Sequence, residues 1–274
     1  LSFREFFTRI VQRSANFLSD ITVDSFCYRI DLRLRPFGDA GPMVSTFDGM
    51  ATYYETQGRT WERYALVKAR LLGGYSVYGE YGPELVGLLR PFVYRRYLDY
   101  GAVQSLRKLK HMIEAELRRK RRLNNFKLGE GGIRENEFIA QVFELMRGGR
   151  YEELRERSLR KTLIALADLE LLPGSVATKL DDAYTFLRRL ENVIQEFSDK
   201  QTQTLPDSER DIARMLIAMK QNSLEDFLKL LREIMAFVHQ EFCQVVSDDG
   251  KDEDNVVGID LWESDYTKEE LATD

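Results

Sequence analysis

Hydrophobic side chains recur at helical spacing along most of this chain, and one stretch near its start alternates instead. Residues 3–19 carry apolar side chains three and four positions apart, which predicts an amphipathic helix. Residues 26–34 alternate charged and apolar side chains, as a strand does, and residues 43–47 predict a second short strand that pairs back across a turn. Because two strands make no stable sheet, we expect the remaining strands upstream, outside a chain that begins with Leu1 and reads as a piece of a longer protein.

From about residue 48 onward the pattern becomes helical. The spacing predicts helices over residues 48–57, 59–72, 82–90, 92–97, 102–122, 133–147, 156–171, 175–199, 207–220 and 223–247. Several of these helices are long and joined by short connections, which favours an antiparallel bundle. The sequence therefore predicts a mainly α chain of the α+β class, with the end of a sheet in residues 1–100, a helical bundle in 101–247 and an acidic tail in 248–274.

Composition narrows the classes of protein that fit. No apolar run approaches the roughly 18 residues of a membrane helix, and nothing at the start resembles a signal peptide. The cysteines, Cys27 and Cys243, are far apart and lack metal-ligand spacing, so we expect a reduced, cytoplasmic protein. Residues 248–274 carry a net charge of −9 and the remainder +4. The basic run at 118–122 has no interleaved aromatic residues for base stacking, which argues against nucleic acid.

The stretch YRIDLRLRPFGDAGP (28–42) holds the first candidate site. Asp31, Arg33 and Arg35 share one face of the alternating segment, which leads into a turn rich in proline and glycine. A carboxylate flanked by guanidinium groups suits a phosphate and its metal ion. The alternatives are an aspartate paired with Arg29 or Arg33 on a strand, and an arginine that holds the 38–41 loop or pairs with Asp39.

Two helical segments hold further candidates. In TWERYALVKAR, Lys68 falls on the same helical face as Trp61 and Tyr64. We therefore expect its side chain to point toward the buried side and either to extend to solvent or to meet an anion. Glu62 is expected to be a local ion-pair partner of Lys68 and Arg70. In LRRLENVIQ, a buried structural ion pair between Arg188 and Glu191 is preferred over a catalytic role.

The stretch KLGEGGIRENEF (127–138) is the second strong signal. Its glycines lead into a helix whose first turns carry Arg134, Glu135 and Glu137. Acidic residues there suit the helix dipole. Glu135, however, lies beside the apolar face, where a carboxylate needs a metal ion, an arginine or a substrate hydroxyl as partner. Asn136 shares a face with Ile139 and is expected to be a locally hydrogen-bonded amide.

Together these segments resemble the glutamine synthetase adenylyltransferase/adenylyl-removing enzyme family. YRIDLRLRPFGDAGP is followed in order by YYETQGRTWERYALVKAR (53–70), KLGEGGIRENEFIAQ, LRRLENVIQ and QTQTLP (201–206), so the resemblance covers roughly residues 1–245. The wording KLG-x-GGIRE with QTQTLP resembles the amino-terminal, adenylyl-removing half. The family usually has an apolar residue where this chain has Asn136.

The resemblance implies a fold and a site. It implies the end of a polymerase-β-type nucleotidyltransferase sheet, in which Asp31 matches the third carboxylate of a Mg²⁺ site. The Gly-Ser…Asp-x-Asp motif that supplies the first two carboxylates does not precede Asp31 in this sequence, so we expect the isolated chain to be inactive. The resemblance further implies Glu135 and Glu137 as catalytic residues, and it implies these phosphate or nucleotide ligands: Arg33, Arg35, Lys68, Arg70 and Arg134.

The implied reaction is phosphorolysis of the adenylyl-tyrosine on glutamine synthetase, which gives ADP and unmodified synthetase. The implied partners are adenylylated glutamine synthetase, a PII-type signalling protein, orthophosphate, ADP and ATP. Two alternatives stay open. The chain could come from the ATP-dependent adenylylating half, or it could be a non-catalytic helical module that binds glutamine synthetase or a PII-type regulator.

Overall fold

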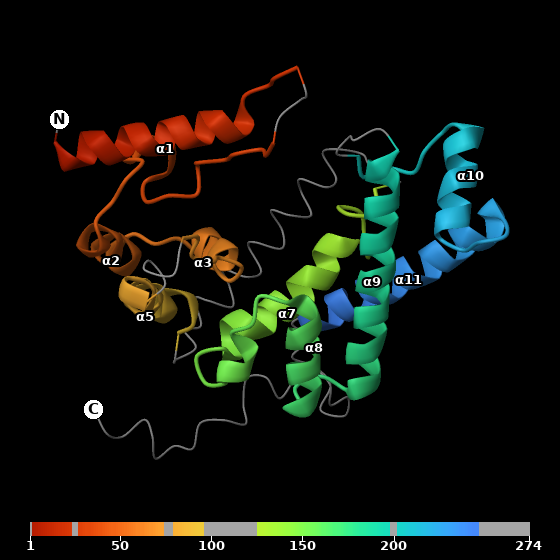
Figure 1. Cartoon of the computed structure of the whole chain (residues 1–274). Helices are drawn as coiled ribbons and strands as arrows, with labels where there is room; N and C mark the ends of the chain where they lie inside the picture. The colour runs from red at the N-terminus through yellow and green to blue at the C-terminus, as the bar shows by residue number, and fades with distance from the viewer. Residues whose placement is uncertain (1, 24–26, 74–78, 96–124, 198–201, 247–274) are drawn as a thin grey trace, which may run out of the picture. The chain divides into compact units, whose positions relative to one another are not determined.

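The computed structural model describes residues 2–23, 27–73, 79–95, 125–197 and 202–246 (Figure 1). The chain divides into two compact units, residues 1–97 and 98–274, and each unit is described by itself. The predicted boundary near residue 100, the predicted helix over 102–122 and the acidic tail all lie outside the described residues.

The first unit begins with an amphipathic helix, α1 (Phe3–Ser19), whose bounds are those that the sequence predicts. Ser2 and Glu5 form a reciprocal capping box that satisfies two backbone N–H groups of its first turn. None of its side chains is buried among the described residues, and Phe3 and Phe17 are 86% and 81% exposed. Its apolar side chains therefore contribute little to the core of this unit.

Three short helices build a small aromatic core in the first unit: α2 (Phe47–Thr56), α3 (Thr60–Leu66) and α5 (Gly82–Val93). Helix α5 packs against both α2 and α3. The Tyr54 and Phe92 rings lie 4.7 Å apart between centroids, and both side chains are buried. These rings share the apolar core of this unit with Tyr53, Val67 and Val93, which are also buried.

The sheet that the alternating pattern predicted is not confirmed. Residues 27–34 and 43–46 form no strand, and the β-pairing seen in the described part of the chain consists of isolated bridges, at Thr22 and between Asn125 and Thr204. Locally, Asp31 Oδ1 accepts the Arg33 N–H at 3.0 Å, a side-chain contact that competes with a strand ladder for that backbone donor. Charge alternation alone therefore does not make a strand here.

Two predicted helix boundaries in the first unit were wrong. Residues 82–90 and 92–97 were expected as separate helices, but α5 runs through Pro91 and ends at Val93. Pro91 lacks the N–H that would bond the Gly87 carbonyl one turn earlier, and the helix ends two residues beyond it. Helix α3 ends at Leu66, so Lys68 lies beyond it rather than on its buried face.

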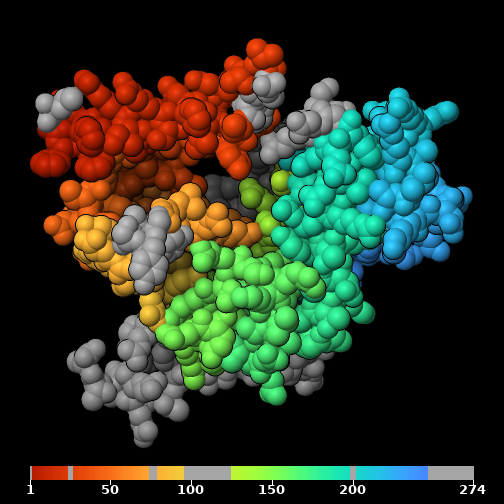
Figure 2. All heavy atoms as spheres, in the orientation of Figure 1, coloured from red at the N-terminus to blue at the C-terminus, as the bar shows by residue number. Residues whose placement is uncertain are grey.

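The second unit is a helical bundle, and the prediction of a mainly helical chain is confirmed. Its helices are α7 (Ile133–Arg147), α8 (Leu159–Asp168), α9 (Gly174–Glu196), α10 (Glu209–Ala218) and α11 (Leu224–Val246). Helix α9 packs against α7, α8, α10 and α11, and α11 also packs against α7 (Figure 1). In Figure 2 the side chains of α8 and α9 form a continuous green-to-teal surface.

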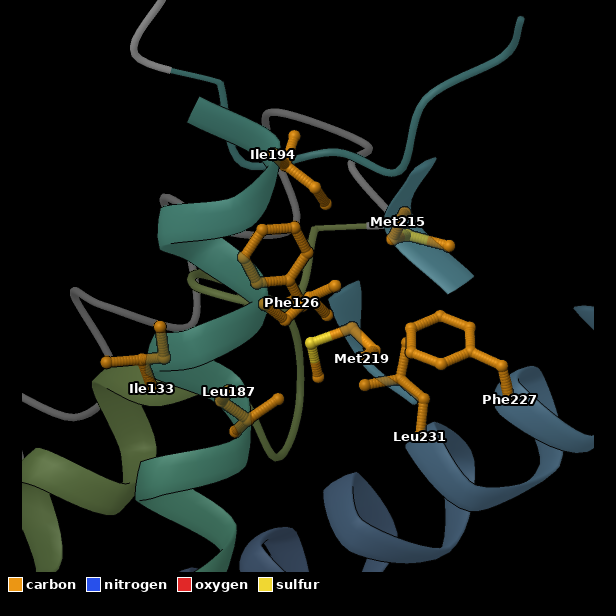
Figure 3. Packing of buried hydrophobic residues seen from close by; sticks show 9 residues of the cluster. Phe126, Ile133, Leu187, Ile194, Met215, Met219, Phe227 and Leu231 are labelled. Atoms are coloured by element: carbon orange, nitrogen blue, oxygen red, sulfur yellow. The ribbon is translucent and has the colours of Figure 1, made fainter. Parts of the chain in front are cut away.

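The core of the second unit joins residues far apart in sequence. Phe126, Ile133, Leu187, Met219 and Phe227 are buried in one cluster (Figure 3). Helix α7 lies deep in this unit, because 13 of its 15 side chains are buried. Among the described helices, none combines the length and apolar character needed to cross a membrane. The buried position of α7 is what makes its polar side chains informative.

Candidate functional site

Asp31 and Arg33 form an exposed, bidentate ion pair in the first unit. Arg33 Nη2 donates to Asp31 Oδ2 at 2.6 Å, and Arg33 Nε donates to Oδ1 at 2.9 Å. Their side chains are 57% and 74% exposed. The hydrogen bonds from the Arg33 side chain and backbone lower the pKa of Asp31 from 3.8 to about 2. Asp31 is therefore an ionised, accessible carboxylate. It is paired with Arg33, one of the two arginines that the alternative prediction named as its partner.

Arg35 holds the turn that follows. Its Nε donates to the Gly41 carbonyl at 3.3 Å, its Nη2 donates to the Asp39 carbonyl at 3.2 Å, and its Nη1 donates to the Leu32 carbonyl. The Asp39 carboxylate lies 3.9 Å from Nη1. This is the loop-holding role that was left open for one of the two arginines. Its predicted contact with phosphate is not tested by this geometry.

The segment around α3 differs from its prediction. Lys68 and Arg70 are both exposed, so the expectation that Lys68 points toward the buried side was wrong. Glu62 is buried and accepts hydrogen bonds from the Tyr53 hydroxyl and the Arg59 backbone N–H, both at 2.8 Å. Glu62 therefore supports the start of α3 and the aromatic core through these contacts. The predicted phosphate contacts of Lys68 and Arg70 stay predictions.

Arg63 is a buried cation in the same helix that the sequence did not single out. Its Nε donates to the Val93 carbonyl at 2.7 Å, which joins α3 to the end of α5. Burial lowers the pKa of Arg63 to about 10. The cost of burying the guanidinium group is offset in part by this contact with a helix-terminal carbonyl.

In the second unit, a glycine loop leads into α7. The Asn125 side chain accepts the backbone N–H groups of Lys127 and Leu128, at 3.0 and 2.8 Å, and fixes the start of the loop. Gly131 has φ of +71°, and a Cβ added there would lie 1.7 Å from the Met235 carbonyl oxygen of α11. Only glycine fits this approach without movement of the backbone. The loop is thus packed directly on α11.

Glu135 is buried and joins this loop to α11. Its Oε2 accepts the Gly131 N–H at 2.8 Å and lies 2.9 Å from His239 Nδ1. Burial raises the pKa of Glu135, and the contacts with His239 and Gly131 oppose that shift. Glu135 was expected to need a partner. The structure supplies a histidine, which was not among the partners considered.

His239 and Cys243 were missed as site residues. His239 Nε2 lies 3.6 Å from Cys243 Sγ, one helical turn along α11. Their spacing of four residues places them on one helix face and was visible in the sequence. Their link to Glu135, across 104 positions of sequence, was not.

The neighbours of Glu135 on α7 have different environments. Arg134 is exposed and Glu137 is half-buried. Burial of Tyr184 on α9 raises the pKa of its hydroxyl, and the charge of Glu137 is the next largest cause of the rise. Asn136 is fully buried, and its Nδ2 donates to the Leu180 carbonyl at 2.9 Å. Its hydrogen bond is therefore made to another helix, and the prediction of a local one was wrong.

Glu191 has the ion pair that the sequence favoured. It is buried on α9, and its oxygens lie 2.6 Å from Arg188 Nη1 and 2.9 Å from Lys127 Nζ. Lys127 belongs to the glycine loop, so this carboxylate attaches the loop to α9. The geometry supports a structural role for Glu191.

The described residues alone do not make a magnesium site. They contain no group of three or more His, Cys, Asp or Glu side chains placed to hold a metal ion. At Asp31, both carboxylate oxygens are occupied by Arg33. Mg²⁺ is held by several oxygen ligands in octahedral geometry, and one carboxylate is too few to fix it. No reaction step is therefore assigned to a metal ion bound by these residues alone.

Comparison with known proteins defines the class first. Residues 1–80 match the family model of glutamate-ammonia ligase adenylyltransferase, and residues 107–246 match that of GlnD PII-uridylyltransferase. Both descriptions name nucleotidyltransferases.

The particular family follows from curated relatives. A bifunctional glutamine synthetase adenylyltransferase/adenylyl-removing enzyme of Psychromonas ingrahamii is 48% identical over 271 residues, which is 98% of this chain and 28% of that protein. An enzyme of the same name from Vibrio parahaemolyticus is 47% identical over 262 residues, 94% of this chain and 28% of its own length. The chain belongs to this family and spans little more than a quarter of the length of these relatives.

Proposed function

We propose that this chain is part of the adenylyl-removing half of a bifunctional enzyme, and that the whole protein phosphorolyses adenylyl-tyrosine on glutamine synthetase to ADP and unmodified synthetase. The observation that carries the proposal is the identity of about 48% along nearly the entire chain with enzymes whose name includes both activities. The assignment to this half rather than the adenylylating one depends on the wording of KLGEGGIRE and QTQTLP.

The exposed Asp31–Arg33 pair supports a role in phosphoryl chemistry. A guanidinium group binds phosphate with the same two-pronged geometry with which Arg33 holds the Asp31 carboxylate. Asp31 has a pKa of about 2, so it is anionic at any physiological pH and suited to be one ligand of Mg²⁺. We assign Asp31 to that ligand set, Arg33 to phosphate, and Arg35 chiefly to the turn that positions them.

In the helical unit, Glu135 and Glu137 are the proposed catalytic residues, and Arg134 is a proposed ligand of phosphate or nucleotide. Glu135 is buried and bonded to Gly131 and His239, which supports a positioning role for it. Glu137 and Arg134 are more accessible and suit direct contact with substrate. Lys68 and Arg70 are exposed cations in the first unit, suited to attract adenylyl phosphate or orthophosphate.

Regulation by a PII-type protein is a second candidate function for the helical unit. Its support is the match of residues 107–246 to a family described as GlnD PII-uridylyltransferase. Titration of the purified chain with a PII-type protein, followed by calorimetry, tests this role independently of catalysis. If a PII-type protein binds neither the chain nor the whole protein, this second candidate function is contradicted.

The central test is Asp31→Asn in the whole protein. Loss of this carboxylate should reduce Mg²⁺-dependent ADP release from adenylylated glutamine synthetase by at least about a hundredfold, because charge neutralisation dominates phosphoryl transfer. Asp20→Asn, at the exposed end of α1, is the matched control and should keep normal turnover. Activity of the Asp31 variant within a few-fold of the unchanged enzyme would contradict the assignment.

A further inference from the structure

A hydrogen-bonded chain of three side chains in the second unit ends at a thiol. Glu135 Oε2 lies 2.9 Å from His239 Nδ1, and His239 Nε2 lies 3.6 Å from Cys243 Sγ. The carboxylate comes from α7, and the imidazole and thiol come from α11, which packs against it. Nothing in adenylyl transfer requires a thiol at this position.

The contacts indicate which atoms carry protons. The Gly131 backbone N–H can only donate, so Glu135 Oε2 is an acceptor in that 2.8 Å contact. With Glu135 ionised, the same oxygen also accepts Nδ1–H of His239. A neutral imidazole protonated at Nδ1 has an unprotonated Nε2, which is the atom that faces Cys243 Sγ. The arrangement is that of a nucleophile, a base and a group that orients the base.

The thiol is accessible as well as oriented. Cys243 is partly exposed and makes no disulfide, and the His239 side chain is 37% exposed, whereas Glu135 is 5% exposed. A small reagent can therefore approach the sulfur while the orienting carboxylate stays out of water. This pattern differs from that of an inert structural cysteine, which lies in apolar surroundings.

We propose that Cys243 is a reactive thiol that exchanges with low-molecular-weight disulfides, with His239 as its base and Glu135 as the residue that positions His239. The Cys243 proton passes to His239 Nε2, and the thiolate attacks one sulfur of the disulfide. A bond from Sγ to that sulfur forms while the disulfide bond breaks. The departing thiolate takes the proton from the imidazolium, so each mixed disulfide at Cys243 releases one small thiol.

Several charges act on this arrangement. Cys243 lies in the last turn of α11, where the helix dipole disfavours a thiolate and favours an imidazolium. On the side of α7, Glu135 contacts the imidazole, and Glu130 in the glycine loop adds negative charge that acts on Glu135. From α9, Lys179 opposes the rise in the pKa of Glu241 that burial causes. Because the helix end opposes the thiolate, His239 is the group on which its formation depends.

The test measures modification of the purified chain by oxidised glutathione at pH 7, with peptide mass mapping of each cysteine over time. An ordinary thiol with a pKa near 8.5 is only about 3% ionised at this pH, so activation should speed the reaction about tenfold. We expect Cys243 to react about ten times faster than Cys27, although Cys27 is the more exposed of the two. Equal rates, or a faster Cys27, would overturn the proposal.

Substitutions test whether His239 acts as the base that activates Cys243. His239→Gln should slow Cys243 about tenfold and leave Cys27 unchanged. Glu135→Gln keeps an acceptor for Gly131 and His239 but removes the negative charge, so an intermediate rate is expected. Glu233→Gln, the same change at an exposed position of α11, is the matched control and should have no effect. An unchanged rate at Cys243 in the His239 variant would contradict the assignment.

A second measurement needs no substitution of Glu135, His239 or Cys243, so it holds even where a variant of these residues fails to fold. In the Cys27→Ser chain, the rate of Cys243 alkylation by iodoacetamide is followed from pH 5 to 10. The half-maximal rate should fall at least one pH unit below that of glutathione measured alongside. A coincident profile would show an ordinary thiol and overturn the proposal. Neither measurement uses adenylyl-removing activity.

Discussion

Asp31 in the first unit and Glu135 in the second were predicted to serve the same chemistry, yet their surroundings differ in kind. Asp31 is exposed, and hydrogen bonds from Arg33 lower its pKa to about 2. Glu135 is 5% exposed, and burial raises its pKa even though His239 and Gly131 donate to it. A carboxylate near an arginine in water is simply held ionised, whereas one inside a helix bundle must be supported by fixed donors.

The same contrast separates the glycines of the two units. Gly131 has a positive φ and lies against the backbone of α11. Gly87 lies within α5, and a Cβ added there would meet no atom within 4 Å. A packed loop needs its glycine, whereas an exposed helix would be better without one.

The largest effect that we predict is therefore from Gly131→Ala. The added methyl group would overlap the Met235 carbonyl, and alanine disfavours the positive φ, so the free energy of unfolding should fall by about 3 kcal/mol or more. Gly87→Ala is the matched control and should raise the free energy of unfolding by about 0.5–1 kcal/mol through helix propensity. Urea denaturation followed by circular dichroism measures both. A small loss at Gly131 would mean that the loop does not pack on α11 as described.

An intermediate effect is predicted for the buried ion pairs of Glu191. Glu191→Gln leaves Arg188 and Lys127 facing a neutral amide, and should lower the free energy of unfolding by about 1–3 kcal/mol. The counterpart is Arg33→Gln, which breaks the exposed pair in the first unit and should lower the free energy of unfolding much less than Glu191→Gln does. Equal losses from the two substitutions would show that exposure does not decide the strength of these pairs.

How far the sequence predicted these features depends on whether a feature is local. Helical periodicity gave the bounds of α1 and α7 correctly, because an amphipathic pattern is contained in the segment itself. The alternation over 26–34 was equally local, but a strand needs neighbours to pair with, and the Asp31 side chain takes up a backbone donor instead. The exposure of Lys68 was missed because α3 ends at Leu66, six residues before the end of the predicted helix over 59–72.

The candidate site shows the same limit. The need of Glu135 for a partner could be predicted from its place beside an apolar face. The identity of that partner could not, because His239 is brought to it only by the packing of α11 on α7. For Arg35, the sequence left open a role in holding the 38–41 loop and a pairing with Asp39. The three backbone carbonyls that accept hydrogen bonds from its side chain reveal the loop-holding role, and their positions depend on the fold.

The smallest predicted effect is a pH dependence of opposite sign in the two units. Because the folded-state pKa of Glu135 is raised, the folded chain binds the proton more tightly than the unfolded chain just above pH 4.5. The free energy of unfolding should therefore decrease as pH rises through this window, by at most about 1.4 kcal/mol per pH unit, and Glu135→Gln should remove that slope. For Asp31, whose pKa is lowered, stability is present above pH 3.8 and is lost as pH falls toward 2. Urea denaturation between pH 2.5 and 5.5 measures both effects. The free energy of unfolding is compared among the unchanged chain, Asp31→Asn and Glu135→Gln. This range lies below the pH at which histidines ordinarily titrate. A Glu135 variant whose stability runs parallel to that of the unchanged chain from pH 4.5 to 5.5 would mean that burial does not raise the pKa of Glu135.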